Sequence, residues 1–96
     1  MFVLALRVDL HLPACRSLKD RRQVVKPILE RARQRFAVSA AELAGHDRWQ
    51  RAHLGFAVIA ESPHHAQEII DEVERFVWSF PEAEVLAVER FWLDDA

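Results

Sequence analysis

The 96-residue sequence contains little glycine and cysteine and has no long apolar run. Gly45 and Gly55 are its only glycines, which excludes the glycine-rich loops that hold nucleotide phosphates. The single cysteine, Cys15, excludes a disulfide framework and a thiolate zinc site and fits a reducing compartment. Arg7 and Asp9 interrupt the apolar N-terminus too early for a signal peptide or membrane span. We therefore expect a cytoplasmic protein that does not bind membranes.

Charge is nearly balanced overall but separated along the chain. Thirteen Lys and Arg residues against fifteen Asp and Glu residues give a net charge of -2. Residues 1–36 carry nine bases and three acids, whereas residues 37–96 carry four bases and twelve acids. This asymmetry predicts a basic face and an acidic face. The hydrophobic content of 51% predicts a folded globule, and the length predicts a single domain over residues 1–96.

The first half of the chain predicts a strand followed by a helix. Apolar residues alternate from Phe2 to Leu12, as in a strand with one buried face, and Pro13 ends the strand. Ser17 is the predicted N-cap of a helix that continues to Phe36. The apolar stripe of this helix consists of Val25, Ile28, Leu29, Ala32 and Phe36. Pro27, inside the stripe, predicts a kink or irregular first turns.

The second half repeats this order after an additional strand. Residues 37–43 predict a strand, residues 45–50 a polar connector, and the alternation from Ala52 to Ala60 a third strand paired with the second. Ser62 and Pro63 begin a second helix, which Pro81 closes, and residues 84–93 form a last strand whose buried side the pattern leaves undecided. The strand–helix–strand–strand–helix–strand order predicts an α+β, ferredoxin-like βαββαβ fold, with a four-stranded antiparallel sheet and both helices on one face.

The other face of the predicted sheet has no helix to cover it. Its apolar and polar positions are Val3, Ala5, Ala57 and Ile59 beside Arg7, Asp9, His11 and His53. A half-apolar open face of this kind is typical of a dimer interface. We therefore expect this face to be a candidate surface for homodimer formation.

The first helix carries the most basic face. At 100° per residue, its bases point away from the apolar stripe. Free amides and the helix dipole also attract anions to its N-terminus. The candidate RNA- or anion-binding residues are Arg16, Ser17, Lys19, Arg22, Lys26 and Arg33, with Trp49 and Gln50 in the connector. The alternative is a solvated face whose bases pair with the acidic second helix. Trp49 either stacks on a base or partner side chain or folds back over the second strand.

Other types of site find little support. His64 and His65 diverge on a helix, and His11 and His53 have no evident third ligand, so we predict no metal or cofactor. Cys15 precedes a helix N-terminus and Arg16, which would lower its thiol pKa, but we favour the interpretation of a small, inert loop cysteine. A standard RNA-recognition motif is excluded because parity places Phe56 in the core. We find no catalytic constellation and predict no enzymatic activity.

Several strings resemble the bacterial YlxP-like family, a domain of unknown function. They are His11-Leu12-Pro13, residues 16–22 (RSLKDRR), residues 35–42 (RFAVSAAE) and residues 47–52 (DRWQRA). The family signature falls here on Arg16, Ser17, Leu18, Lys19, Arg22, Lys26, Phe36, Ser39, Glu42, Trp49 and Gln50. The sequence departs from the family at Arg21, where Lys is usual, and at Ala37, where Asn is usual; loss of that Asn removes a side-chain hydrogen bond at the start of the strand.

The resemblance implies a ferredoxin-like fold and no established activity. The family's usual gene neighbourhood, beside transcription-elongation, translation-initiation and ribosome-maturation factors, implies a link to RNA. The leading hypothesis is therefore a non-enzymatic accessory protein that binds RNA or the ribosome through its basic first helix. The alternative is a self-associating regulatory or adaptor domain that meets an acidic protein partner.

Overall fold

The structure is a computed structural model that describes residues 1–44 and 48–93. Its elements are β1 (Phe2–His11), α1 (Leu18–Phe36), β2 (Ser39–Leu43), β3 (Arg51–Ala60), α2 (Pro63–Trp78) and β4 (Glu84–Trp92). This order confirms the predicted βαββαβ arrangement. Residues 45–47 of the predicted connector lie outside the described residues.

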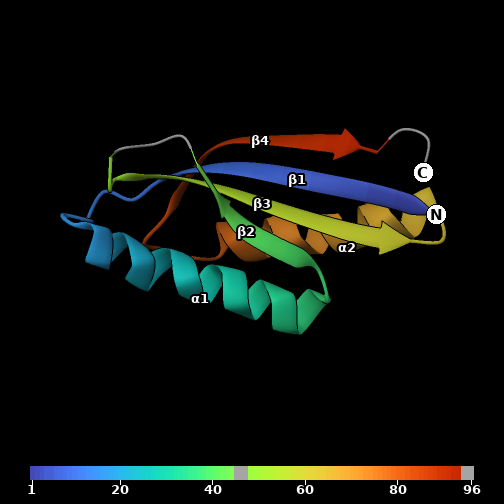
Figure 1. Cartoon of the computed structure of the whole chain (residues 1–96), viewed down its shortest axis with the longest axis horizontal. Coiled ribbons are helices and arrows are strands. Elements are labelled where there is room, and N and C mark those ends of the chain that lie inside the picture. The colour runs from blue at the N-terminus through green and yellow to red at the C-terminus, as the bar shows by residue number, and fades with distance from the viewer. Residues whose placement is uncertain (45–47, 94–96) are drawn as a thin grey trace.

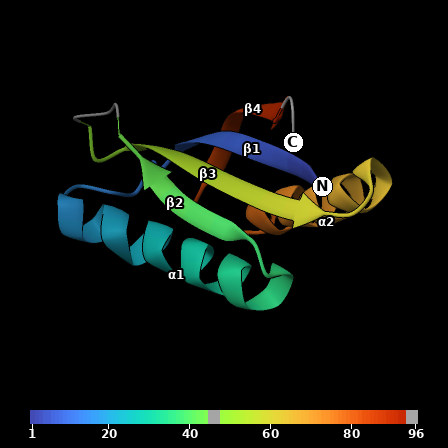
Figure 2. The same ribbon diagram turned by 45° about the vertical axis from the view of Figure 1, so that its right-hand side comes forward.

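The four strands form one antiparallel sheet in the order β2-β3-β1-β4. Both helices lie against the same face of this sheet, with α1 beneath β2 (Figure 1). The turned view shows the same two layers, with the other sheet face uncovered (Figure 2). The ferredoxin-like fold predicted from the sequence is therefore confirmed.

The central strands β1 and β3 bury every second side chain, as their alternation predicts. Leu4, Leu6, Val8 and Leu10 of β1 face the helices and are buried. Phe2, also predicted to be buried, is 39% exposed because it lies at the end of the strand. Phe56 of β3 is buried in the same core, which supports the exclusion of an RNA-recognition motif.

Helix α1 has the predicted cap and buried stripe. The Ser17 hydroxyl accepts a hydrogen bond from the Asp20 amide, and Val25, Ile28, Leu29 and Ala32 are buried. The predicted irregular first turns are absent, since the helix is continuous from Leu18 to Phe36 with Pro27 inside it. The carbonyl that Pro27 leaves without a helical partner belongs to exposed Gln23, where water can satisfy it.

The pairing of β4 explains why the sequence did not show which side of this strand is buried. It pairs only with β1 among the described strands, and its register shifts between Asp9 and Leu10. This bulge reverses the alternation part-way along the strand. As an edge strand, β4 also leaves Val88, Phe91 and Trp92 exposed, so no clean apolar period develops.

The connection from α1 to β2 passes through a left-handed residue. Ala37, the C-cap of α1, has φ 52° and ψ 42°. This conformation is favourable for glycine and tolerated by asparagine, but it crowds the Cβ of other residues. The departure at Ala37 therefore falls at a helix end that requires an unusual backbone conformation.

We predict that Ala37→Gly and Ala37→Asn each stabilise the fold. Removal of the left-handed penalty should raise the free energy of unfolding by about 0.5–1 kcal/mol, measured by chemical denaturation. Gln34→Gly, at an exposed position inside the helix, is the control and should lower it by about 1 kcal/mol. Equal destabilisation by Ala37→Gly and Gln34→Gly would contradict the strain at Ala37.

Candidate anion-binding surface

The basic residues of α1 form three groups that face different neighbours. One group contacts the sheet and connector, a second lies on aromatic rings next to α2, and a third points to solvent. The members are Arg21 and Arg33 in the first group, Arg31 and Arg35 in the second, and Lys19, Arg22 and Lys26 in the third. Among the described residues, the third group contacts neither the sheet, nor the connector, nor an aromatic ring.

Arg21 fastens the connector to α1. Its Nη1 donates to the carbonyl oxygens of Arg48 and Arg51, at 3.0 and 3.3 Å. Its Nε lies 3.3 Å from Oε2 of Glu42 on β2. Because the guanidinium is a rigid fork with several donors, one side chain joins α1 to β2, to the connector and to the first residue of β3. Sequence reasoning counted Arg21 only as a base, since its three partners are distant in sequence.

Arg33 also has a structural partner. Its Nη2 donates to the carbonyl oxygen of Ala40 on β2, so the guanidinium predicted to contact phosphate also holds the edge strand to α1. Arg33 remains exposed. It therefore lies at the border of the solvent-facing group, with part of its hydrogen-bonding capacity already used.

The solvent-facing group lacks the partners that the alternative interpretation requires. Asp71 and Glu74 of α2 contact Arg90 of β4, at 2.8 and 3.2 Å. The ion pair of Lys26 is with Glu30 in the same helix, at 3.8 Å. Among the described residues, no ion pair joins α1 to α2. The alternative, in which the basic helix pairs with the acidic helix, therefore has no ion pair to support it in this part of the chain, because β4 supplies the base that α2 contacts.

The N-terminus of α1 is occupied by a carboxylate of the chain itself. Oδ2 of Asp20 accepts from the Arg16 amide at 2.9 Å, and the Ser17 hydroxyl accepts from the Asp20 amide at 3.1 Å. An incoming phosphate would meet this negative charge. The side of the helix is therefore more favourable for an anion than its end.

Cys15 lies next to this cap, buried in the core. Burial and the neighbouring Asp20 carboxylate raise the pKa of its thiol, and the lowering effect of Arg21 is smaller. The expectation of a lowered pKa was wrong, because the cap provides a carboxylate and burial where only a cation and free amides were foreseen.

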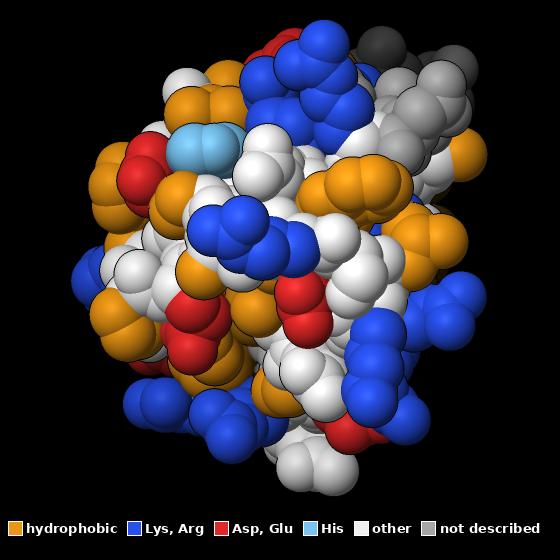
Figure 3. All heavy atoms as spheres, turned by 90° about the vertical axis from the view of Figure 1, so that its left-hand side faces the viewer, with side chains coloured by type: hydrophobic (Ala, Val, Ile, Leu, Met, Phe, Trp, Pro, Cys, Tyr) orange, Lys and Arg blue, Asp and Glu red, His pale blue; other side chains and the backbone are white. Residues whose placement is uncertain are grey.

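The described part of the connector, residues 48–50, lies beside the N-terminal end of α1. The Leu12 amide donates to the Gln50 carbonyl at 2.8 Å, and Trp49 is 45% exposed. Lys and Arg side chains surround this end of the molecule, with hydrophobic groups between them (Figure 3). The structure thus brings Trp49 and Gln50 to the same end as Arg16 and Lys19.

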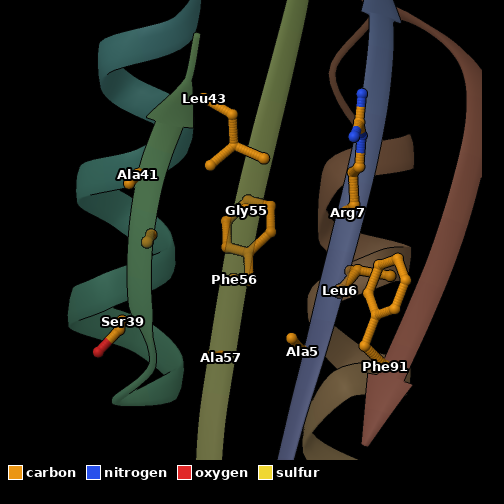
Figure 4. A pocket seen from close by; sticks show the side chains of 11 residues that line it. Ala5, Leu6, Arg7, Ser39, Ala41, Leu43, Gly55, Phe56, Ala57 and Phe91 are labelled. Atoms are coloured by element: carbon orange, nitrogen blue, oxygen red, sulfur yellow. The ribbon is translucent and has the colours of Figure 1, made fainter.

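The open sheet face holds a second candidate site, a shallow depression of about 490 Å³. Small residues form its floor, and Leu43 and Phe91 lie on either side (Figure 4). Gly55 contributes to this shape, because a Cβ there would lie 3.2 Å from the Leu43 side chain. Most of the lining is apolar, as the predicted open face requires.

Polar residues border the depression in a compact group. Arg7 Nη2 lies 2.6 Å from His53 Nδ1, and Arg7 Nε lies 3.4 Å from Asp9 Oδ1. A guanidinium can only donate, so His53 Nδ1 accepts. His11 contacts Glu84 instead, with 3.2 Å between Nδ1 and Oε2, so the two histidines do not form a shared site. Within residues 1–44 and 48–93, no three metal-ligating side chains cluster.

Comparison with known proteins shows to which family the chain belongs. The family model "Protein of unknown function (DUF503)" matches residues 3–90. The chain belongs to this family. It is 37% identical over 76 residues to the "Uncharacterized protein YlxP" of Bacillus subtilis strain 168, covering 79% of this chain and 83% of the relative. The predicted resemblance is confirmed, and the relative is itself uncharacterised.

Solved structures show the fold alone. The de novo designed protein Foldit4 matches with a TM-score of 0.58 at 14% identity, covering 95% of this chain and 97% of the design. The de novo designed protein LFR1 1, with ferredoxin fold, matches at 0.52 and 15% identity, covering 96% of this chain and 85% of the design. No helix among the described residues is long and apolar enough to cross a membrane.

We predict that Arg21→Gln loosens the connector from α1. Loss of two hydrogen bonds and a half-buried ion pair should lower the free energy of unfolding by about 1–2 kcal/mol. Amide hydrogen exchange should quicken at Leu12 and Arg51. Arg21→Lys should have a smaller effect, because one ammonium keeps the charge but not the fork.

Arg22→Gln provides the matched control on the adjacent exposed position. It should change the free energy of unfolding by less than about 0.5 kcal/mol. Equal effects of Arg21→Gln and Arg22→Gln would show that Arg21 does not hold the connector.

Proposed function

We propose that the protein is a non-enzymatic, cytoplasmic accessory protein that binds RNA or a ribonucleoprotein through the exposed side of α1. Lys19, Arg22 and Lys26 contact phosphates, with Arg16 at the helix start and Arg33 near its end. Trp49 stacks on a base, and Gln50 supplies a polar contact beside it. The proposal agrees with the link to RNA that the family resemblance implies.

The observation that carries this proposal is the separation of α1 from acidic partners. Arg90 on β4 contacts Asp71 and Glu74 of α2, and His64 and His65 lie near Glu68. Three acids of α2, Glu68, Asp71 and Glu74, are thus engaged away from the solvent-facing bases of α1. A basic line remains on a surface whose total charge is acidic, which favours local, limited phosphate contact over nonspecific coating.

The spacing of the line suits a nucleic-acid backbone. Lys19, Arg22 and Lys26 are three and four residues apart and therefore lie on one side of the helix. Arg21 anchors residues 48–50 next to the start of this line. One ring for stacking and several cations are thus held together at one end, which is the usual combination for single-stranded nucleic acid.

We predict that Lys19→Gln with Arg22→Gln weakens RNA binding and its salt dependence. Loss of two phosphate contacts should reduce the slope of log K against log salt by about 1.4 for a single strand. The measurement is fluorescence anisotropy of labelled ribosomal RNA fragments at several salt concentrations. The wild-type chain should bind at low salt with a slope of about -2 to -3.5, corresponding to three to five phosphates.

His64→Glu with Gln67→Glu is the charge-matched control, because it also lowers the net charge by two but on exposed positions of α2. It should leave the slope unchanged. No binding by the wild-type chain at low salt, or equal loss in both double variants, would refute binding through α1.

A second candidate function is self-association through the open sheet face. Phe91, 50% exposed, lines the apolar depression, and Ile59, 69% exposed, lies further along β3 on the same face; Arg7 and Asp9 balance each other in charge. A second copy of this chain would therefore meet a largely apolar surface whose bordering charges, Arg7 and Asp9, neutralise each other. If two copies met through their helix layers instead, the line of Lys19, Arg22 and Lys26 in one copy would face the same line in the other.

We predict a dimer in solution that Ile59→Gln with Phe91→Gln converts to a monomer, as measured by sedimentation equilibrium. Each change replaces apolar surface that a dimer would bury. Trp78→Gln removes an equally exposed ring from the end of α2 and should leave the dimer intact. A monomeric wild-type chain at tens of micromolar would exclude this function.

A further inference from the structure

A polar groove lies in the helix layer, on the opposite flank of α1 from its sheet contacts. It has a volume of about 500 Å³. An adjoining groove has a volume of about 330 Å³. Arg35, Phe76 and Ser79 line both, so the two form one continuous surface around Arg35. Volumes of this size are typical of small-ligand sites. We call this surface the α1–α2 groove.

Arg35 lies beside two aromatic rings in the centre of the groove. Its guanidinium carbon lies 5.2 Å from the Phe36 ring centre and 5.9 Å from that of Phe76. The two ring centres are themselves 5.5 Å apart, and the rings are inclined at 70° to each other, so at most one of them can lie parallel to the guanidinium. Because Arg35 is exposed, its guanidinium remains accessible to a ligand.

Two further arginines lie on either side of Arg35, one in each part of the groove. Arg31 lines the larger part and lies 6.0 Å from the Phe80 ring centre, and Arg75 lines the smaller part. Among the described residues, no ion pair joins these three arginines to a carboxylate. Glu72 and Glu82 also line the groove, so its five charges leave an excess of one positive charge.

We propose that the α1–α2 groove binds one nucleotide of a single-stranded RNA. The base stacks on the exposed guanidinium of Arg35, and Arg31 and Arg75 contact the phosphates on either side of it. This inference rests on the proposed function for the source of the ligand. It adds a base-binding site that lies on a different side of α1 from the line of Lys19, Arg22 and Lys26.

The chemistry of the groove favours a nucleotide over a bare anion. An exposed guanidinium plane is a recognised surface for stacking an unpaired base. The edges of Arg31 and Arg75 can donate paired hydrogen bonds to phosphate oxygens. The Gln23 amide also lines the groove and can both donate to and accept from a base edge. A simple anion would bind to the edges of Arg31 and Arg75 but would not stack on the guanidinium plane of Arg35.

The test is a titration of the full chain with adenosine 5′-monophosphate and, separately, with ribose 5-phosphate. Binding is followed by NMR on the Nε–Hε signals of Arg31, Arg35 and Arg75. Adenosine 5′-monophosphate should bind at least about fivefold more tightly than ribose 5-phosphate, since stacking contributes only for the former. Equal affinity for the two compounds, or no shift of the Arg35 signal, would overturn the proposal.

Two substitutions at Arg35 distinguish the contribution of its flat guanidinium from the contribution of its charge. Arg35→Lys keeps the charge but removes the flat surface, and Arg35→Gln removes both. Both should weaken adenosine 5′-monophosphate binding at least about fivefold, with unchanged thermal unfolding confirming that the fold persists. Wild-type affinity in Arg35→Lys would show that charge alone acts, and would refute base stacking.

The two proposals fail in distinguishable ways. Lys19→Gln with Arg22→Gln should weaken long RNA while leaving adenosine 5′-monophosphate affinity unchanged, because neither residue lines the groove. If long RNA does not bind but the nucleotide does, the function through α1 is wrong and the groove remains. If long RNA binds with the predicted salt slope and the nucleotide does not, only the groove is wrong.

Discussion

Burial of one face of β1 and β3 beneath two helices is the constraint on which the rest of the structure depends. Every second side chain of these strands enters the core, so a shift of one residue would expose the whole set. Two helices can cover one sheet face and no more. The opposite face is therefore left open, and the outer sides of α1 and α2 are left to solvent. The three candidate surfaces result from this arrangement. They are the open sheet face, the exposed side of α1 and the α1–α2 groove.

Charge is arranged on these layers with little cancellation across the helix pair. Arg90 on the edge strand contacts the acids of α2, while Arg21 and Arg33 of α1 hold the connector and β2. A base at these positions is structural in the sense that its removal leaves a backbone carbonyl or a carboxylate without its partner. The remaining bases of α1 have no comparable task in the described structure. Bases and acids that are separated along the sequence therefore lie on different surfaces of the folded chain.

Regular burial made the fold predictable, whereas the site depends on contacts between distant residues. The alternation in β1 and the stripe of α1 predicted both elements, because each depends on a local period that the core enforces. Strand β4 gave no such period, since a bulge and an edge position interrupt it. The roles of Arg21, Arg33 and Arg35 were equally hidden. Their partners on β2, in the connector and on α2 come near only in the folded chain, and nothing in a basic run shows which member will contact an aromatic ring.

The two layers also allow the candidate functions to act together. A second copy seated on the open sheet face would lie on the side opposite the helices (Figure 2), so both copies of α1 would remain accessible. The dimer would then present two basic lines and two α1–α2 grooves to one strand of RNA. Two linked sites bind more tightly than one wherever a single ligand can reach both. If both candidate functions hold, self-association would therefore strengthen RNA binding without any new contact to RNA.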